Sequence, residues 1–259
     1  MKIIESYITN NENYQSNVKI TVQGIVIHSV GVAQPDPQVF VRVFNVPRPN
    51  GVQVGTHAFL GQEPVVYQTL PWNHKGWHCG GVANNTHIGI EMTEPSTIKY
   101  GVNTSTTPYP IVHQGMGIVD TNPTQTKAFI TAVYRNTVEL AAMLCTQYNL
   151  DPLKSGVIIS HAEGYQLGKC SNHADPAHLW RYMDLTMDQF RFDVAKKLQA
   201  DAIPPATPPT TAVATDEPSQ WATIPWDWAT QAGITDGTRP KDTTTREELV
   251  TMLYRYHNH

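Results

Sequence analysis

Residues 22–28 read Val22-Gln23-Gly24-Ile25-Val26-Ile27-His28, an apolar and β-branched run that ends in a histidine. Such a run is typical of a strand that is buried on both faces of a sheet. A second run, Gly156-Val157-Ile158-Ile159-Ser160-His161, has the same character and also ends in a histidine. Since ligands of α/β proteins gather where strands end and loops begin, we expect the two imidazoles to converge at one edge of a sheet.

Strand and helix signals alternate through the first 200 residues or so. Two more strands are expected at 64–70 and 87–92, and apolar side chains recur at helical spacing over 124–149 and 187–199. This alternation predicts an α/β fold around one central sheet.

The composition of the chain changes after residue 200. The segment 202–218 holds five prolines and little that could be buried, which is typical of a semi-extended linker. We therefore predict a large domain at 1–200, a linker at 201–217 and a small module at 218–259, which is marginal for independent folding.

Composition excludes several classes of protein. A net charge of −4 argues against a nucleic-acid binder, and 40% hydrophobic residues argue against a disordered chain. No apolar run is long enough to insert into a membrane, and the start at 1–6 lacks the core of a signal peptide. The three cysteines, Cys79, Cys145 and Cys170, cannot close a disulfide framework. The 11 histidines stand out as candidate metal ligands and proton carriers.

The two strand-end histidines suit a zinc site. A catalytic zinc takes three protein ligands and keeps one position open for water. The third ligand would come from the loop after His161, where Asp175 is the first choice and Cys170 and His173 are the alternatives. No compact pair of histidines on one helix is present, so the spacing leaves open that His28 and His161 are structural.

A zinc-bound water needs a base to take its proton. Glu91 interrupts the apolar strand 87–92, where a buried carboxylate is costly without a partner. Glu91 therefore either faces solvent on an edge strand or points into a cleft as that base.

Five ordered segments carry a resemblance to a known family. They read Gly24-Ile25-Val26-Ile27-His28-Ser29, Gly76-Trp77-His78-Cys79-Gly80-Gly81, Asn85-Thr86-His87-Ile88-Gly89-Ile90-Glu91, Ser160-His161-Ala162-Glu163-Gly164 and Ser171-Asn172-His173-Ala174-Asp175-Pro176. Over residues 20–185 the chain resembles the zinc-dependent N-acetylmuramoyl-L-alanine amidases, the group that includes recycling amidases and peptidoglycan recognition proteins. The resemblance implies a mixed β-sheet flanked by helices, with a zinc groove that holds peptidoglycan and hydrolysis of the bond between N-acetylmuramic acid and L-alanine.

The resemblance also implies roles for single residues. His28 and His161 match the two histidine ligands of zinc, and Asp175 matches the third ligand of members that carry Asp-Pro there. Glu91 matches the proposed base. His173 falls where relatives often carry a lysine that stabilises the oxyanion, so this role passes to an imidazole. The resemblance also implies that Trp77 and His78 line the groove, and the alternative for Trp77 is a packed core residue.

The small module resembles an S-layer homology motif. Residues 221–229, 233–238 and 244–255 predict helix, Gly-rich loop and helix, with an apolar face formed by Leu249, Val250, Leu253 and Tyr256. Such motifs bind secondary cell-wall polymers, usually as three copies, and one copy is visible here. We expect wall binding or self-association, and the alternative is a tail docked on the large domain.

The leading hypothesis is a peptidoglycan hydrolase of the phage-endolysin kind, made in the cytoplasm and acting at the bacterial cell wall. The alternative is a module that recognises peptidoglycan without cutting it. Because the candidate ligands and Glu91 are all present, the sequence favours catalysis. A structural S-layer component would need export and more repeats.

Overall fold

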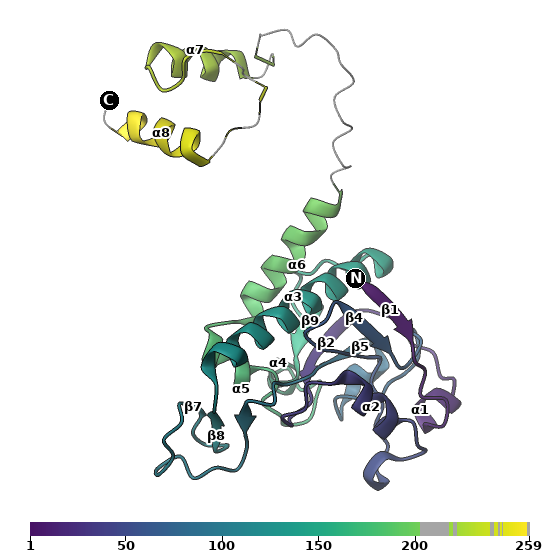
Figure 1. The fold of residues 1–259 in the computed structure, drawn as a ribbon. Coiled ribbons are helices and arrows are strands. Elements are labelled where there is room, and N and C mark those ends of the chain that lie inside the picture. The colour runs from purple at the N-terminus through teal and green to yellow at the C-terminus, as the bar shows by residue number, and fades with distance from the viewer. Residues whose placement is uncertain (203–217, 220–221, 239–240, 243, 245, 258–259) are drawn as a thin grey trace. The chain divides into compact units, whose positions relative to one another are not determined.

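The computed structural model of the chain describes residues 1–202, 218–219, 222–238, 241–242, 244 and 246–257 (Figure 1). Two compact units are present, Met1–Ile203 and Pro204–His259, and each is described by itself. Apart from residues 201 and 202, the predicted linker at 201–217 lies outside the described residues.

A six-stranded sheet forms the centre of the first unit (Figure 1). Its order is β1 (Lys2–Glu5), β4 (Val65–Gln68), β3 (Ala58–Leu60), β5 (His87–Met92), β2 (Gly24–Ser29) and β9 (Ile158–Ser160). The pair β3 and β4 is antiparallel, and the other pairs are parallel. The expectation of an α/β fold with a mixed central sheet flanked by helices is therefore confirmed.

Helices cover both faces of this sheet. Helices α3 (Pro123–Tyr148) and α6 (Met187–Ala202) pack together, and their apolar side chains share one core with Ala58 and Leu60 of β3. Phe59, between those two residues, instead stacks on Phe40 of α2 (Pro37–Phe44), with ring centroids 5.3 Å apart. Since successive strand side chains point to opposite faces, α2 and α3 lie on opposite sides of the sheet.

Smaller elements complete the first unit. A three-stranded sheet has the order β6 (Ile98–Lys99), β8 (Ile118–Asp120) and β7 (Ile111–His113). The short helices are α1 (Glu12–Gln15), α4 (His161–Gln166) and α5 (Ala177–Trp180), with 3-10 turns at Pro49–Gly51, Val82–Asn85 and Arg181–Met183. The sequence patterns signalled none of these short elements, because they contain too few residues to show a period.

The register of the central strands places the candidate residues. Ile90 of β5 pairs with Ile27 of β2 on one side and with Ala58 of β3 on the other, and all three side chains face the α3 core. The next row, His28, Glu91 and Phe59, therefore faces the α2 side. Strand β5 lies between β3 and β2, so the structure excludes an edge-strand position for Glu91.

The second unit contains α7 (Thr223–Gln231) and α8 (Arg246–His257). Ile234 is its buried apolar residue among those described, whereas the expected apolar face, Leu249, Val250, Leu253 and Tyr256, is more than half exposed. Among the described residues, no helix is both long and apolar enough to span a bilayer.

Asn136 gives a test of how α3 is attached to the sheet. Its buried side-chain amide Nδ2 donates to the carbonyl oxygens of Gly61, Gln62 and Glu63, at 3.0, 3.0 and 2.9 Å, in the turn between β3 and β4. We expect Asn136→Asp to lower the free energy of unfolding by about 2–4 kcal/mol, because a carboxylate would face three carbonyl oxygens.

Urea unfolding followed by circular dichroism measures this loss. Asn103→Asp is the matched control, because the exposed Asn103 side chain accepts a hydrogen bond from Ser105, which a carboxylate still does. Equal unfolding midpoints for the two variants would contradict the proposed attachment.

Candidate metal site

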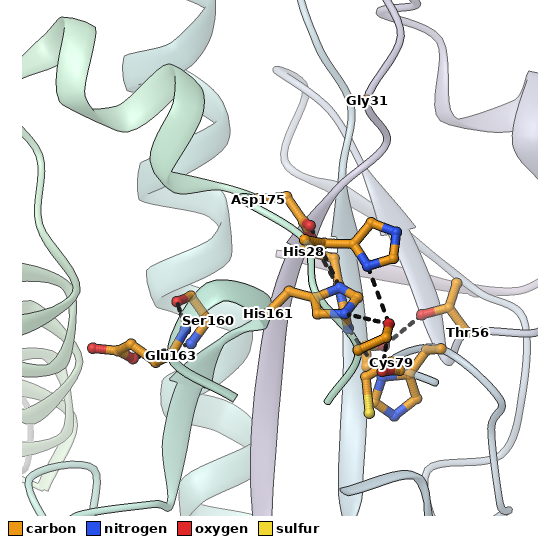
Figure 2. A network of polar contacts seen from close by, with 12 residues as sticks. His28, Gly31, Thr56, Cys79, Ser160, His161, Glu163 and Asp175 are labelled. Atoms are coloured by element: carbon orange, nitrogen blue, oxygen red, sulfur yellow. Dashed lines mark hydrogen bonds and ion pairs between the residues drawn. The ribbon is translucent and has the colours of Figure 1, made fainter. Parts of the chain in front are cut away.

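Three side chains far apart in the sequence meet at one point of the first unit (Figure 2). His28 Nδ1 lies 3.1 Å from both His161 Nδ1 and Asp175 Oδ2, and His161 Nδ1 lies 3.4 Å from Asp175 Oδ1. The candidate ligand atoms all lie within 4.8 Å of one another. Ligand atoms about 2.1 Å from a tetrahedral zinc are roughly 3.4 Å apart, so this spacing suits one shared zinc ion.

Local structure fixes each of the three groups. His28 lies near the end of β2 and is 1% exposed. His161 does not end a strand, as the sequence pattern suggested, but is the first residue of α4. Ser160 caps this helix through a reciprocal capping box with Glu163, so the backbone turns sharply at His161. Asp175 lies in the loop before α5, and its backbone carbonyl accepts the N–H of Ala162.

A chain of hydrogen bonds determines which nitrogen of His28 carries hydrogen. His78 Nε2 lies 3.1 Å from the carbonyl oxygen of His87, which can only accept, so His78 Nε2 is the donor. Burial, followed by the neighbouring His28, lowers the pKa of His78 well below its usual value, so His78 is neutral and its Nδ1 accepts. His28 Nε2, 3.0 Å away, must therefore donate, which leaves the His28 Nδ1 lone pair facing the site.

Ser171 plays the corresponding part behind His161. Its hydroxyl donates to the carbonyl oxygen of Cys79 at 3.1 Å, so its oxygen can accept from His161 Nε2, 3.2 Å away. The Nδ1 lone pair of His161 then also faces the site. In this arrangement two imidazole lone pairs and a carboxylate face one another with no hydrogen between them. A cation binds such electron-pair donors, so these residues fit a zinc ion.

Burial keeps the His28 imidazole in the form that binds metal. Desolvation is the main cause that lowers the pKa of His28, and it lowers the pKa of His57 to about 4. Burial alone would raise the pKa of Asp175, but the adjacent His161 and His28 lower it below the usual range. The cluster therefore contains the Asp175 carboxylate beside a His28 imidazole that burial keeps neutral near neutral pH.

Glu91 lies beside His28 on the neighbouring strand, where the two residues are paired in register. Burial, then the charges of Asp175 and Glu94, raise the pKa of the Glu91 carboxyl well above its usual value. A carboxyl group with a raised pKa next to a candidate metal site can exchange protons near neutral pH.

The alternative ligands lie elsewhere. Cys170 is buried in a small cluster with Cys79 and Val26, and its thiol interacts with that of Cys79. His173 is exposed, with its ring 4.4 Å from the His161 ring and its Nδ1 3.1 Å from Ser171 Oγ. Neither residue belongs to the cluster formed by His28, His161 and Asp175 among the described residues.

The two candidate groove residues differ in position. Trp77 is 38% exposed, with Lys75 Nζ 5.1 Å from its ring centroid, so Trp77 is not a packed core residue. His78 is buried behind His28, with both ring nitrogens engaged by protein atoms. It packs against Gly89, where an added Cβ would come within 2.4 Å of His78 Cγ.

Sequence reasoning missed the partners of the candidate ligands, His78 as a partner of His28 and Ser171 as a partner of His161. Both residues lie within the five ordered segments, and the general need of a metal-bound imidazole for an outer hydrogen-bond partner was the signal available. Glu163, which also lies near His161 in sequence, instead pairs with Arg191 at 3.0 Å.

Comparisons with known proteins identify a family for this chain. The family described as Amidase_2, N-acetylmuramoyl-L-alanine amidase, matches residues 18–178, which is more than half of the chain and includes the three candidate ligands and Glu91. No curated protein matches the chain.

Solved structures share the fold. The catalytic domain of XlyA is 20% identical in sequence to this chain, with a TM-score of 0.51. The match covers 75% of this chain and 99% of the XlyA domain. The Staphylococcus aureus hydrolase AmiA, in complex with its ligand, is 21% identical, with a TM-score of 0.55. The match covers 78% of this chain and 85% of the AmiA chain. A PlyL mutant is 14% identical, with a TM-score of 0.50. The match covers 75% of this chain and 99% of the PlyL chain.

The raised pKa of Glu91 predicts a stability difference that depends on pH. A carboxyl whose pKa is raised in the folded state stabilises the fold below its unfolded pKa, about 4.3, and this contribution is lost as the pH rises through the folded pKa. In metal-free protein, we expect Glu91→Gln and the wild type to have the same free energy of unfolding near pH 4. At pH 8 the free energy of unfolding of Glu91→Gln should be higher by about 1 kcal/mol or more.

Urea unfolding of the metal-free proteins at several pH values measures the difference. Glu63→Gln, at an exposed position in the turn after β3, is the control and should change little over the same range. A Glu91→Gln difference that does not grow with pH would show that burial does not perturb this carboxyl group.

Proposed function

The chain belongs to the N-acetylmuramoyl-L-alanine amidase family, and on that premise we propose that its first unit is a zinc-dependent peptidoglycan hydrolase. It would cleave the amide bond between N-acetylmuramic acid and the L-alanine of the stem peptide. The observation that carries this proposal is the convergence of His28, His161 and Asp175, whose candidate ligand atoms all lie within 4.8 Å of one another.

The chemistry follows from the positions of the side chains. A zinc ion held by these three groups would polarise the scissile carbonyl and lower the pKa of a water molecule toward about 7. Glu91, in register with His28, would accept the proton of the attacking water and pass it to the leaving amine of L-alanine.

Two exposed side chains complete the proposed site. The His173 ring, against the ring of His161, would donate a hydrogen bond to the developing oxyanion. The partly exposed Trp77 would contact the sugar or the peptide, whereas His78 would act through His28 rather than through the substrate.

The alternative is a module that holds peptidoglycan without cutting it. The complete ligand set and a carboxyl group with a raised pKa beside it favour catalysis.

For the second unit we propose attachment to a secondary cell-wall polymer, so that the enzyme acts at the bacterial wall. A cavity of about 420 Å³ lies between the described parts of α7 and α8, and Trp226, Asp236, Thr238 and Arg255 are among its lining residues. Aromatic, hydroxyl and charged groups together suit a polar polymer. The exposed apolar side chains of α8 make self-association the alternative.

Digestion of purified wall tests the reaction. We expect new N-terminal alanine without new reducing sugar ends, and loss of activity with a chelator. Glu91→Ala should lower kcat by about 10²- to 10⁴-fold, because the general base is removed. If Glu91→Ala cuts as fast as the wild type, the assignment of the base is wrong.

Zinc content in the same experiment tests the third ligand. Asp175→Ala should lose zinc, while the matched variant Cys170→Ala should keep it, because Cys170 faces Cys79. The opposite pattern would replace Asp175 by Cys170 in the ligand set.

Removal of the second unit tests wall attachment. We expect a chain that ends at residue 202 to sediment with purified wall at least tenfold more weakly than the full chain, and to hydrolyse a soluble muropeptide at the same rate. Equal binding would refute attachment, and concentration-dependent sedimentation of the full chain without wall would support self-association.

A further inference from the structure

A buried carboxylate lies close behind the proposed metal site. Glu94 follows β5, three residues after Glu91, and its side chain is fully enclosed. Its Oε1 accepts the N–H of Gly31 at 3.0 Å, and its Oε2 accepts the hydroxyl of Tyr100 at 2.5 Å. Enclosing a carboxylate is costly unless such contacts compensate for lost water, so these bonds restrain the residues that make them.

His178 closes a triangle with these two side chains. Its Nε2 lies 3.3 Å from Glu94 Oε1 and 3.0 Å from the Tyr100 hydroxyl oxygen. Because the Tyr100 hydroxyl donates to Glu94, its oxygen is free to accept, and His178 Nε2 therefore carries the hydrogen. Burial, then the charges of Glu94 and Asp175, raise the pKa of Tyr100, so the hydroxyl remains a donor.

These three side chains, the Glu94 triad, connect the segments that carry the site. Gly31 lies three residues after His28, Glu94 three residues after Glu91, and His178 three residues after Asp175. The triad therefore links the loop after β2, the end of β5 and helix α5 through side chains that are buried or partly buried.

Among the proposed ligands, Asp175 most needs such support. His28 is held by a strand and His161 by a capped helix, whereas Asp175 lies in a loop. The N–H of His178 donates to the carbonyl of Ala174 at 3.3 Å, so Asp175 and His178 share one turn of the chain. Beyond His178, Leu179 and Trp180 are buried in the main core, so α5 is held both by the core and by the triad.

We propose that Glu94, Tyr100 and His178 are positioning residues that hold Asp175 against His28 and His161 and thereby set the metal affinity of the site. This proposal rests on the proposed function, in which these three groups bind zinc. The triad acts on the backbone turn of Asp175 rather than on the metal or the substrate. Loss of partners outside the ligand shell typically weakens metal binding ten- to a hundredfold.

Tyr100→Phe tests the proposal, since it removes one hydroxyl and keeps the ring. We expect at least a tenfold loss of zinc affinity, measured on the metal-free full chain by competition with a chromophoric chelator. The matched control is Tyr134→Phe, which breaks a similar bond, from the Tyr134 hydroxyl to Asp193 Oδ2 at 2.8 Å, between α3 and α6. If both variants bind zinc equally well, or lose affinity equally, the triad does not position Asp175.

A second pair of variants separates positioning from general stability. His178→Gln keeps an N–H donor near Nε2 and should retain most of the zinc affinity, whereas His178→Leu should lose at least tenfold. In an Asp175→Ala background, Tyr100→Phe should cause no further loss, because the positioned ligand is already absent. A further loss there, or equal affinities for His178→Gln and His178→Leu, would overturn the proposal even if Tyr100→Phe failed to fold.

Two outcomes distinguish this proposal from the proposed function. If the wild-type chain does not bind zinc, or if Asp175→Ala leaves binding unchanged, the function fails and the proposal falls with it. If Asp175→Ala weakens binding and Tyr100→Phe does not, the function stands and the positioning role alone is refuted.

Discussion

The parallel pairing of β2 with β5 is the constraint on which the rest of the site depends. This pairing places His28 opposite Glu91 on one face of the sheet, while Ile27 and Ile90 on the other face enter the α3 core. Slipping β2 by one residue would turn His28 to the α3 face and bury it among apolar side chains, away from Glu91. The same hydrophobic burial that fixes the sheet therefore fixes the relative position of the proposed ligand and the proposed base.

Polar groups around the proposed metal are arranged so that hydrogens point away from it. His78 receives the hydrogen of His28 because its own hydrogen is directed to the His87 carbonyl, and Ser171 is placed to receive that of His161. Gly89 permits this arrangement, since a side chain there would overlap the ring of His78. The Glu94 triad adds a further layer on the side of Asp175, so loop segments gain an order that secondary structure alone does not supply.

The two units meet different physical demands. The first unit buries one extensive apolar core against both α3 and α6 and can hold polar groups in fixed positions. Among the described residues of the second unit, large apolar side chains such as Ile224 and Val250 are mostly exposed. A small helical unit with such a surface gains stability by covering it, which is consistent with a role in attachment or association rather than in chemistry.

The sequence alone predicted β2, β5, α3 and the alternation of strands and helices, because these elements are long enough to show a regular apolar pattern. The five ordered segments pointed to the candidate site residues His28, His161, Asp175 and Glu91. Local sequence also signalled where the candidate site would lie, since polar residues followed apolar strands. The order of residues left open whether Glu91 lay at an edge, which loop residue approached the histidines and what lay behind them. Those points depended on strand order, on the turn into α5 and on buried side-chain hydrogen bonds. Several of these bonds join residues 50 or more positions apart, such as His28 with His78 and Asp175, and no local pattern encodes such contacts.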